Sequence, residues 1–340
     1  RLYLYYHTVV ENTSMPVVNM VKALNQALHE EMERDDKVVI LGEDVAQVGG
    51  VFRVTEGLLE RFGCKRVIDT PVSEAGILGC ALGMALGGLK PIAEIQFSGF
   101  MHNGFHQLNC HAARYRTRSW GSYNVPMVMR APIGGGIRAL EHHNDSEEAL
   151  YVQSPGLKVV FPSSPRNAHG LLLSAIRDPD PVMYLEPKRV YRAIREEVPE
   201  GAEAIPFGQA QIMLEGKDIT LISYGAMLQE SLEAADKAAS ELKCSVEVID
   251  LLSIVPMDVD TIIASVKKTG RCVVVHEAPQ SCGVGAEVIA RINDHALLYL
   301  EAPVARVTGY DIPYPFFARE SGYLPSVPRI LGAIRKTLEF

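Results

Sequence analysis

The feature that most restricts the fold is a regular alternation between short apolar segments and segments with helical spacing of apolar residues. Segments 38–41, 219–223 and 272–275 are almost uninterruptedly apolar, whereas segment 19–34 carries its apolar residues three and four positions apart. Short apolar strands that alternate with helices are typical of a parallel sheet covered on both faces. The sequence therefore predicts an α/β protein with mostly parallel sheets.

The alternation is interrupted once, between residues 188 and 208, where charged residues accompany prolines and glycines. The chain has 340 residues, and a single hydrophobic core rarely grows beyond about 250–300 residues. We therefore predict a first α/β domain over residues 15–187, a linker over 188–208 and a second α/β domain over 209–340. Residues 1–14 are expected to be an extension without a role in the fold.

The composition limits the cellular compartments and the classes of binding partner that fit this chain. The net charge of -8 argues against nucleic acid or an anionic membrane as a general partner. The six cysteines are scattered and form no CxxC pair, which favours reduced thiols. We expect a cytoplasmic protein, or one of the mitochondrial matrix if it is eukaryotic and has lost a transit peptide.

The stretch 70–89, TPVSEAGILGCALGMALGGL, combines a turn, a helix and regularly spaced glycines. Glu74 opens the predicted helix, and Gly79, Gly83 and Gly87 recur every four residues. The helix dipole stabilises a carboxylate in the first turn, so Glu74 could simply be a helix-start acid. Each glycine costs about 1 kcal/mol of helix propensity. We therefore expect this helix face to pack closely against a partner helix.

Polar residues in two places admit both functional and structural roles. His142 and His143 lie in a glycine-rich loop, where histidines are often functional, but a solvated loop explains them too. Asp178 and Asp180 could form a turn or offer oxygen ligands to a cation. The alternation also predicts a helix from Gly99 to Tyr115. Four residues of this helix share helical spacing and could bind zinc, although packing histidines are commoner: His102, His106, Cys110 and His111.

Five segments, in order along the chain, resemble the beta subunit of thiamine-diphosphate-dependent 2-oxo acid dehydrogenases. They are LGEDVAQVGGVFRVTEGL, RVIDTPVSEAGILGCALGMALGGLKPIAEIQF, SPGLKVVFPSSPRNAHGLLLSAIRDPDPVMYLEPKRVYR, EVIDLLSIVPMDVDTI and VVVHEAP. The resemblance implies a transketolase-like pyrimidine-binding domain followed by a transketolase C-terminal-like domain. AEIQF and LEPKRVYR are most similar to branched-chain (2-oxoisovalerate) members. A pyruvate or acetoin dehydrogenase beta subunit and a non-catalytic interaction subunit are the alternatives.

The resemblance also implies roles for individual residues. Glu74 matches the glutamate that hydrogen-bonds the aminopyrimidine ring of thiamine diphosphate, and Phe100 matches the aromatic residue that stacks on that ring. Val72 and Gln96 match positions that line the same pocket. His143 matches the loop histidine that acts as acid and base during acyl transfer to lipoamide. Here the family usually has His-Ser-Gln, and the neighbouring His142 leaves the choice of histidine open.

Ions and partners follow from the same resemblance. Ala175, Asp178 and Asp180 match positions that can hold a structural potassium ion, although Asp180 often has an amide counterpart. The sequence has no Gly-Asp-Gly motif, through which such enzymes hold magnesium and diphosphate, and no other phosphate-binding motif. We therefore expect an alpha subunit to hold most of the magnesium site in a two-alpha, two-beta heterotetramer. The expected reaction is oxidative decarboxylation of a small branched-chain 2-oxo acid, with reductive acylation of the lipoyl group of an acyltransferase.

Overall fold

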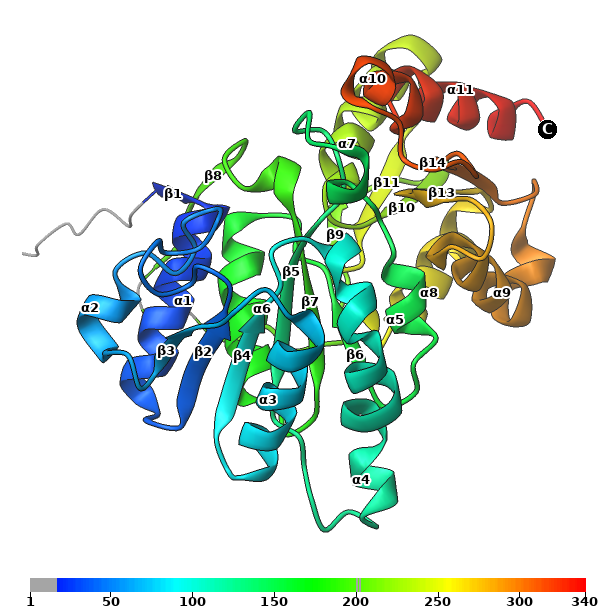
Figure 1. Cartoon of the computed structure of the whole chain (residues 1–340). Helices are drawn as coiled ribbons and strands as arrows, with labels where there is room; N and C mark the ends of the chain where they lie inside the picture. The colour runs from blue at the N-terminus through cyan, green and yellow to red at the C-terminus, as the bar shows by residue number, and fades with distance from the viewer. Residues whose placement is uncertain (1–16, 200, 202) are drawn as a thin grey trace, which may run out of the picture.

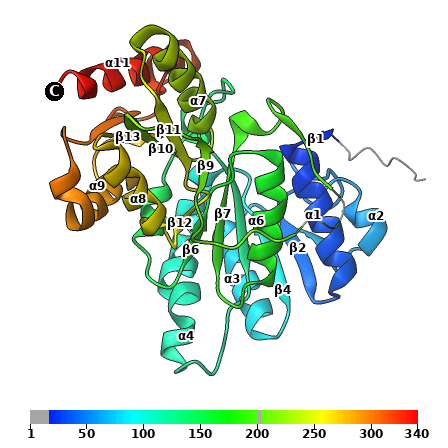
Figure 2. The ribbon, with the colours of Figure 1, turned by 180° about the vertical axis from the view of Figure 1, so that it is seen from behind.

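The computed structural model describes residues 17–199, 201 and 203–340, so the predicted extension 1–14 lies outside the described residues. The described part contains a seven-stranded sheet, a five-stranded sheet and a two-stranded sheet. The two larger sheets lie side by side, each between layers of helices (Figures 1 and 2).

The first large sheet has the strand order β12-β6-β7-β5-β4-β2-β3, and all of its pairs except β12–β6 are parallel. Its strands are β2 (Val38–Gly42), β3 (Val67–Asp69), β4 (Lys90–Glu94), β5 (Val128–Ile133), β6 (Lys158–Val160), β7 (Val182–Pro187) and β12 (Ser253–Val255). Because β12 comes from the second half of the chain, the two halves share one hydrogen-bonded sheet.

Helices cover both faces of this sheet. α1 (Met20–Arg34) and α6 (Pro165–Arg177) pack together on one face, and α3 (Glu74–Leu86) lies on the other (Figures 1 and 2). α1 and α3 each begin directly after a capping residue: the side chains of Asn19 and Ser73 accept hydrogen bonds from backbone N–H groups of the first turn. Three short helices complete this part: α2 (Leu58–Phe62), α4 (Tyr115–Arg118) and α5 (Glu148–Val152).

The second large sheet has the order β14-β13-β10-β11-β9, with only β9 antiparallel to its neighbour. Its strands are β9 (Gln211–Leu214), β10 (Ile219–Ser223), β11 (Val246–Asp250), β13 (Cys272–Pro279) and β14 (Ala305–Gly309). Its helices are α7 (Met227–Lys237), α8 (Val259–Thr269), α9 (Val284–Ala296), α10 (Glu320–Tyr323) and α11 (Val327–Leu338). α7 packs against α11, and α8 packs against α9.

The predicted linker is more structured than its composition suggests. A 3-10 turn spans Lys188–Val190, and β8 (Arg195–Glu197) pairs antiparallel with β1 (Val17–Asn19). Lys188, Val190 and Tyr191 are buried. The domain limits at residues 187 and 209 stay a prediction.

One predicted element is wrong. A continuous helix was expected from Gly99 to Tyr115, but the chain forms a 3-10 helix (Ser98–Gly104), a π-helical turn (Gln107–His111), a second 3-10 turn (Ala112–Arg114) and then α4. Tertiary packing explains the first irregularity. A Cβ atom at Gly99 would lie 2.3 Å from the carbonyl oxygen of His142, so this segment follows the surface of a distant loop.

The hydrophobic core forms two layers that continue across both large sheets. One contains residues of α1, α6, α7 and α11, and the other contains residues of α3, α8 and α9. Because both layers cross the boundary between the sheets, the halves are packed as one body. No helix among the described residues is long and apolar enough to cross a membrane.

Candidate active site

Glu74 is the first residue of α3 and lies at the carboxyl edge of the first sheet, directly after β3 and a short turn. Its side chain is buried, with 8% of the residue exposed. Among the described residues, its carboxylate accepts one long hydrogen bond, from Asn103 Nδ2 to Oε2 at 3.4 Å. The carboxylate therefore retains unused hydrogen-bonding capacity.

A second carboxylate, Glu43, lies beside Glu74 and was not singled out from the sequence. It follows β2, which pairs in parallel with β3, so both acids reach the same sheet edge. Burial, the negative charge of Glu74 and that of Asp44 raise the pKa of Glu43. The sequence held a usable signal, namely an acid placed directly after a buried strand.

The irregular segment after β4 brings Phe100 to the predicted histidine. The ring centroids of Phe100 and His143 are 5.1 Å apart, and those of Phe97 and His143 are 4.6 Å apart. Gln96 is half-buried at the start of this segment. Val72 is 80% exposed in the turn before α3. Asn103, which contacts Glu74, belongs to the same 3-10 helix as Phe100 and so connects the two halves of the site.

The two loop histidines have different surroundings. His142 is half exposed, and its Nδ1 lies 3.0 Å from the Asp145 carboxylate. His143 packs between aromatic rings, and its Nδ1 is buried without a hydrogen-bond partner among the described residues. Burial, then the nearby charge of Lys188, lowers the pKa of His143. The imidazole of His143 is therefore biased toward its neutral form.

Asn144 and Asp145 replace the Ser and Gln that are usual in the family that the sequence resembles, and both stabilise the loop. Asn144 is fully buried, and its Nδ2 donates to the carbonyl oxygens of Ala139 and Leu140, each at 3.0 Å. Asp145 holds His142, and its carbonyl oxygen accepts a hydrogen bond from Ser98 Oγ at 3.2 Å. The sequence His143-Asn144-Asp145 thus forms a well-anchored loop.

The predicted potassium position has its side chains already paired. Lys158 Nζ lies 2.6 Å from both carboxylate oxygens of Asp178, and Arg116 Nε lies 2.6 Å from Asp180 Oδ1. The carbonyl oxygen of Ala175 accepts from the backbone N–H of Asp178 at 3.3 Å. A cation here would have to rely on backbone oxygens, so the potassium site stays a prediction. In the described part of the chain, no group of three histidine, cysteine or acidic side chains is arranged to hold a metal ion.

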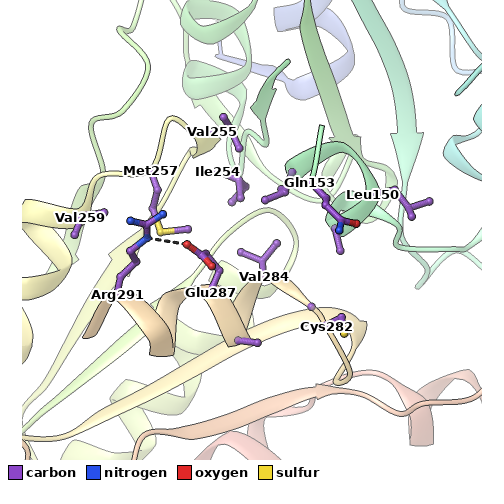
Figure 3. A pocket seen from close by; sticks show the side chains of 14 residues that line it. Leu150, Gln153, Ile254, Val255, Met257, Val259, Cys282, Val284, Glu287 and Arg291 are labelled. Carbon is purple, nitrogen blue, oxygen red and sulfur yellow. Dashed lines mark hydrogen bonds and ion pairs between the residues drawn. The ribbon is translucent and has the colours of Figure 1, made fainter. Parts of the chain in front are cut away.

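A cleft of about 900 Å³ lies between α5, β12 and the start of α9 (Figure 3). Its walls are mostly apolar, with an ion pair between Glu287 and Arg291 at 2.7 Å on one side. None of the predicted site residues lines it. The cleft is therefore separate from the Glu74–His143 region.

The predicted site residues thus separate into three places. Glu74, Phe100 and His143 form one connected region at the edge of the first sheet, with Gln96 close to it in sequence. Val72 lies at its exposed margin. Ala175 lies in the last turn of α6, and Asp178 and Asp180 follow that helix in a separate cluster of ion pairs.

Comparisons with known proteins show the family of this chain. The sequence matches the transketolase pyrimidine-binding domain over residues 17–193 and the transketolase C-terminal domain over residues 208–330. A split-gene transketolase, solved as an inactive beta4 tetramer, has the same fold, with a TM-score of 0.79 at 21% identity over 95% of this chain and 99% of its own. These findings confirm the predicted transketolase-like α/β architecture.

Close sequence relatives are named pyruvate dehydrogenase E1 component subunit beta. The protein of Staphylococcus epidermidis is 51% identical over 96% of this chain and 100% of its own length. Those of Acholeplasma laidlawii and Bacillus subtilis are 50% and 49% identical, over 95% and 96% of this chain and 98% and 100% of their own lengths. The chain therefore belongs to the family of beta subunits of thiamine-diphosphate-dependent 2-oxo acid dehydrogenase E1 components.

Proposed function

We propose that this chain is the beta subunit of a pyruvate dehydrogenase E1 component, which decarboxylates pyruvate and transfers the acyl group to a lipoyl group. The proposal rests on one observation: relatives that are 49–51% identical over their full length are named pyruvate dehydrogenase E1 component subunit beta. The branched-chain preference expected from the sequence finds no support among these relatives. It remains the second candidate, because AEIQF and LEPKRVYR are similar to branched-chain members.

Thiamine diphosphate, when bound, supplies the electron sink for decarboxylation. The residues of the candidate site fit such a group. Glu74 is buried but accepts only one long hydrogen bond, so it can hold a proton shared with a ring nitrogen. Phe100 offers an aromatic face to a planar ring, and Gln96 offers a neutral amide beside it. Val72 would border the entrance.

His143 is proposed as the acid and base of the acyl-transfer half of the reaction. Its lowered pKa keeps the imidazole neutral near pH 7, so the ring can accept the proton that a hydroxyl group loses as it becomes the acyl carbonyl, and can pass a proton to the sulfur released from the lipoyl disulfide. Its aromatic neighbours hold the ring in place. His142, whose ring is held by Asp145 and half exposed, is the less suitable of the two.

The site is proposed to be completed by an alpha subunit that holds magnesium and the diphosphate. This chain has no motif that would bind a diphosphate. Along α3, Gly83 and Gly87 are exposed, and a Cβ atom at Gly83 would meet no atom within 4 Å. The described residues therefore supply no close partner for the exposed part of the glycine face, and a second subunit could approach there. We further propose that the two subunits form a two-alpha, two-beta heterotetramer in the cytoplasm. This heterotetramer would bind potassium and act on the lipoyl group of an acyltransferase.

Calorimetry tests the divided site. The chain purified alone should bind no thiamine diphosphate at micromolar concentrations in the presence of magnesium, and co-expression with its alpha subunit should restore binding. Tight magnesium-dependent binding by the isolated chain would refute the division.

The substrate is tested in the reconstituted complex with pyruvate and 2-oxoisovalerate assayed side by side. A higher kcat/KM for pyruvate is expected. A preference for 2-oxoisovalerate would restore the branched-chain candidate. Absence of turnover with any 2-oxo acid, despite cofactor binding, would favour a non-catalytic interaction subunit.

A further inference from the structure

We propose that Lys188 is a positioning residue for His143, fixing the backbone of the histidine and holding a positive charge beside its ring. The inference rests on the acid and base role proposed above for His143. Lys188 directly follows β7 and is the first residue of the predicted linker.

Lys188 contacts the histidine at two points. The residue is 3% exposed, and its Nζ donates a hydrogen bond to the carbonyl oxygen of His143. The same ammonium group lies 5.2 Å from the centre of the Phe97 ring, and that ring packs edge-on against the His143 imidazole. One buried cation therefore touches both the backbone of His143 and the ring that supports its side chain.

A buried ammonium group is costly unless negative charge compensates it. Three carboxylates from different elements face Lys188: Glu277 of β13, Glu320 of α10 and Asp145 of the histidine loop. None of them forms a direct ion pair with it among the described residues. Burial outweighs their attraction and lowers the pKa of Lys188 to about 8. Near neutral pH the group is still mostly charged.

Two of these carboxylates also hold the start of the loop that carries His143. Glu277 accepts a hydrogen bond from the backbone N–H of Gly135, and Glu320 Oε1 accepts one from Gly136 at 2.7 Å. A Cβ atom at Gly135 would lie 1.7 Å from the Tyr314 hydroxyl oxygen, so only glycine permits this approach. The second half of the chain thus fixes the first turn of the loop, and Lys188 fixes its histidine end.

The positive charge of Lys188 lowers the pKa of His143. The charged or titratable groups that act on His143 are Lys188, His142 and Glu141; the first two lower its pKa and the third raises it. Loss of the lysine charge should therefore raise the pKa of His143. A like charge at this range typically displaces a pKa by about 1 pH unit or more.

The direct test is an NMR titration of the full-length chain with ring-labelled histidine, in which the His143 signal is assigned with His143→Gln. Lys188→Met removes the charge and the donor, Lys188→Gln removes only the charge, and Lys188→Arg retains both. The first two should raise the His143 midpoint by about 1 pH unit, and the third should leave it near the wild-type value. Arg189→Gln is the matched control, because Arg189 pairs with Glu230 instead.

An unchanged midpoint in Lys188→Gln, or an equal change in the Arg189 control, would overturn the proposal. If Lys188→Met fails to fold, the comparison of the Gln and Arg variants still decides. A second measurement separates the half-reactions in the assembled complex at pH 7. Lys188→Gln should lower lipoyl-domain acylation about 2- to 3-fold more than decarboxylation with an artificial electron acceptor, because a His143 midpoint about 1 pH unit higher lowers the neutral fraction of the ring at pH 7. A parallel loss of both half-reactions would indicate a merely structural residue.

Failure of the proposed function would be recognised separately. If the wild-type complex decarboxylates no 2-oxo acid, the function is wrong, whereas the NMR titration still reports whether Lys188 sets the state of His143.

Discussion

Replacing Arg130 by methionine should destabilise the fold more than any surface change. Arg130 lies within β5 and is 1% exposed. Its Nε and Nη2 donate to the two carboxylate oxygens of Glu186 at 2.6 and 2.9 Å, and its Nη1 donates to Glu94 Oε2 at 2.7 Å. Both acids are buried, so the substitution would strand two carboxylates in the centre of the first sheet.

Removing one partner of a buried ion pair costs about 3–5 kcal/mol, because the remaining charge has neither partner nor water. Two carboxylates lose their cationic partner here, and Glu186 retains only the hydrogen bond from the Tyr191 hydroxyl at 2.5 Å, so we expect a loss near the upper end, about 5 kcal/mol. Domains are stable by about 5–15 kcal/mol in total. The variant should therefore fold marginally.

The loss should depend on pH. Burial raises the pKa of Glu94 despite the attraction of Arg130, and removal of the arginine should raise it further. A carboxyl group whose folded pKa exceeds its unfolded value favours folding at low pH, and this contribution disappears as the pH rises through the folded pKa. The deficit of Arg130→Met should therefore be smaller at pH 5 than at pH 8.

The assay is urea unfolding followed by circular dichroism at both pH values. Lys22→Met serves as the control, because Lys22 pairs with Glu56 at 3.2 Å while both side chains are about half exposed. Such a pair contributes about 0–1 kcal/mol. A loss for Arg130→Met within the range of the control, or one that grows toward pH 5, would refute the reasoning.

Three further predictions concern the site and its ions. Glu74→Gln should abolish decarboxylation and slow exchange of the thiazolium C2 proton in the assembled enzyme about 10²–10⁴-fold, and the variant should still co-purify with the alpha subunit. Proton exchange at the wild-type rate would show that Glu74 has no role in proton transfer. His143→Ala should impair acyl transfer to a lipoyl domain more than decarboxylation, and more than His142→Ala does in the same two assays; the reverse order would reassign the acid and base. Potassium should raise the thermal unfolding midpoint relative to tetramethylammonium at equal ionic strength, and Lys158→Met, which frees Asp178, should enlarge that difference; equal midpoints in both salts would exclude the ion.

The sequence alone determined most of the regular elements, because their signals are local. Short apolar runs between helical segments, such as 219–223, favour buried strands, and β10 has those limits. Asn19 and Ser73 cap helices that begin at the next residue. The start of α3 at Glu74 was also predicted from the sequence, whereas the roles of Glu74 and His143 stay predictions from the family resemblance.

Tertiary structure decided what depends on contacts between distant segments. The helix expected from Gly99 to Tyr115 is broken where Gly99 meets the loop of His142, a contact that no local pattern encodes. Strand β12 joins the first sheet although it lies in the second half of the chain. Its three residues are too short a pattern to assign without the pairing partner.

The surroundings of the site were likewise decided in three dimensions. Glu43 and Glu74 come together because β2 and β3 are adjacent parallel strands that end at one edge. Lys188 looked like part of a charged linker, and only the fold shows it buried against His143. A sequence specifies which side chains are charged, but burial and the approach of distant groups set their pKa values and partners, and these exist only in the folded chain.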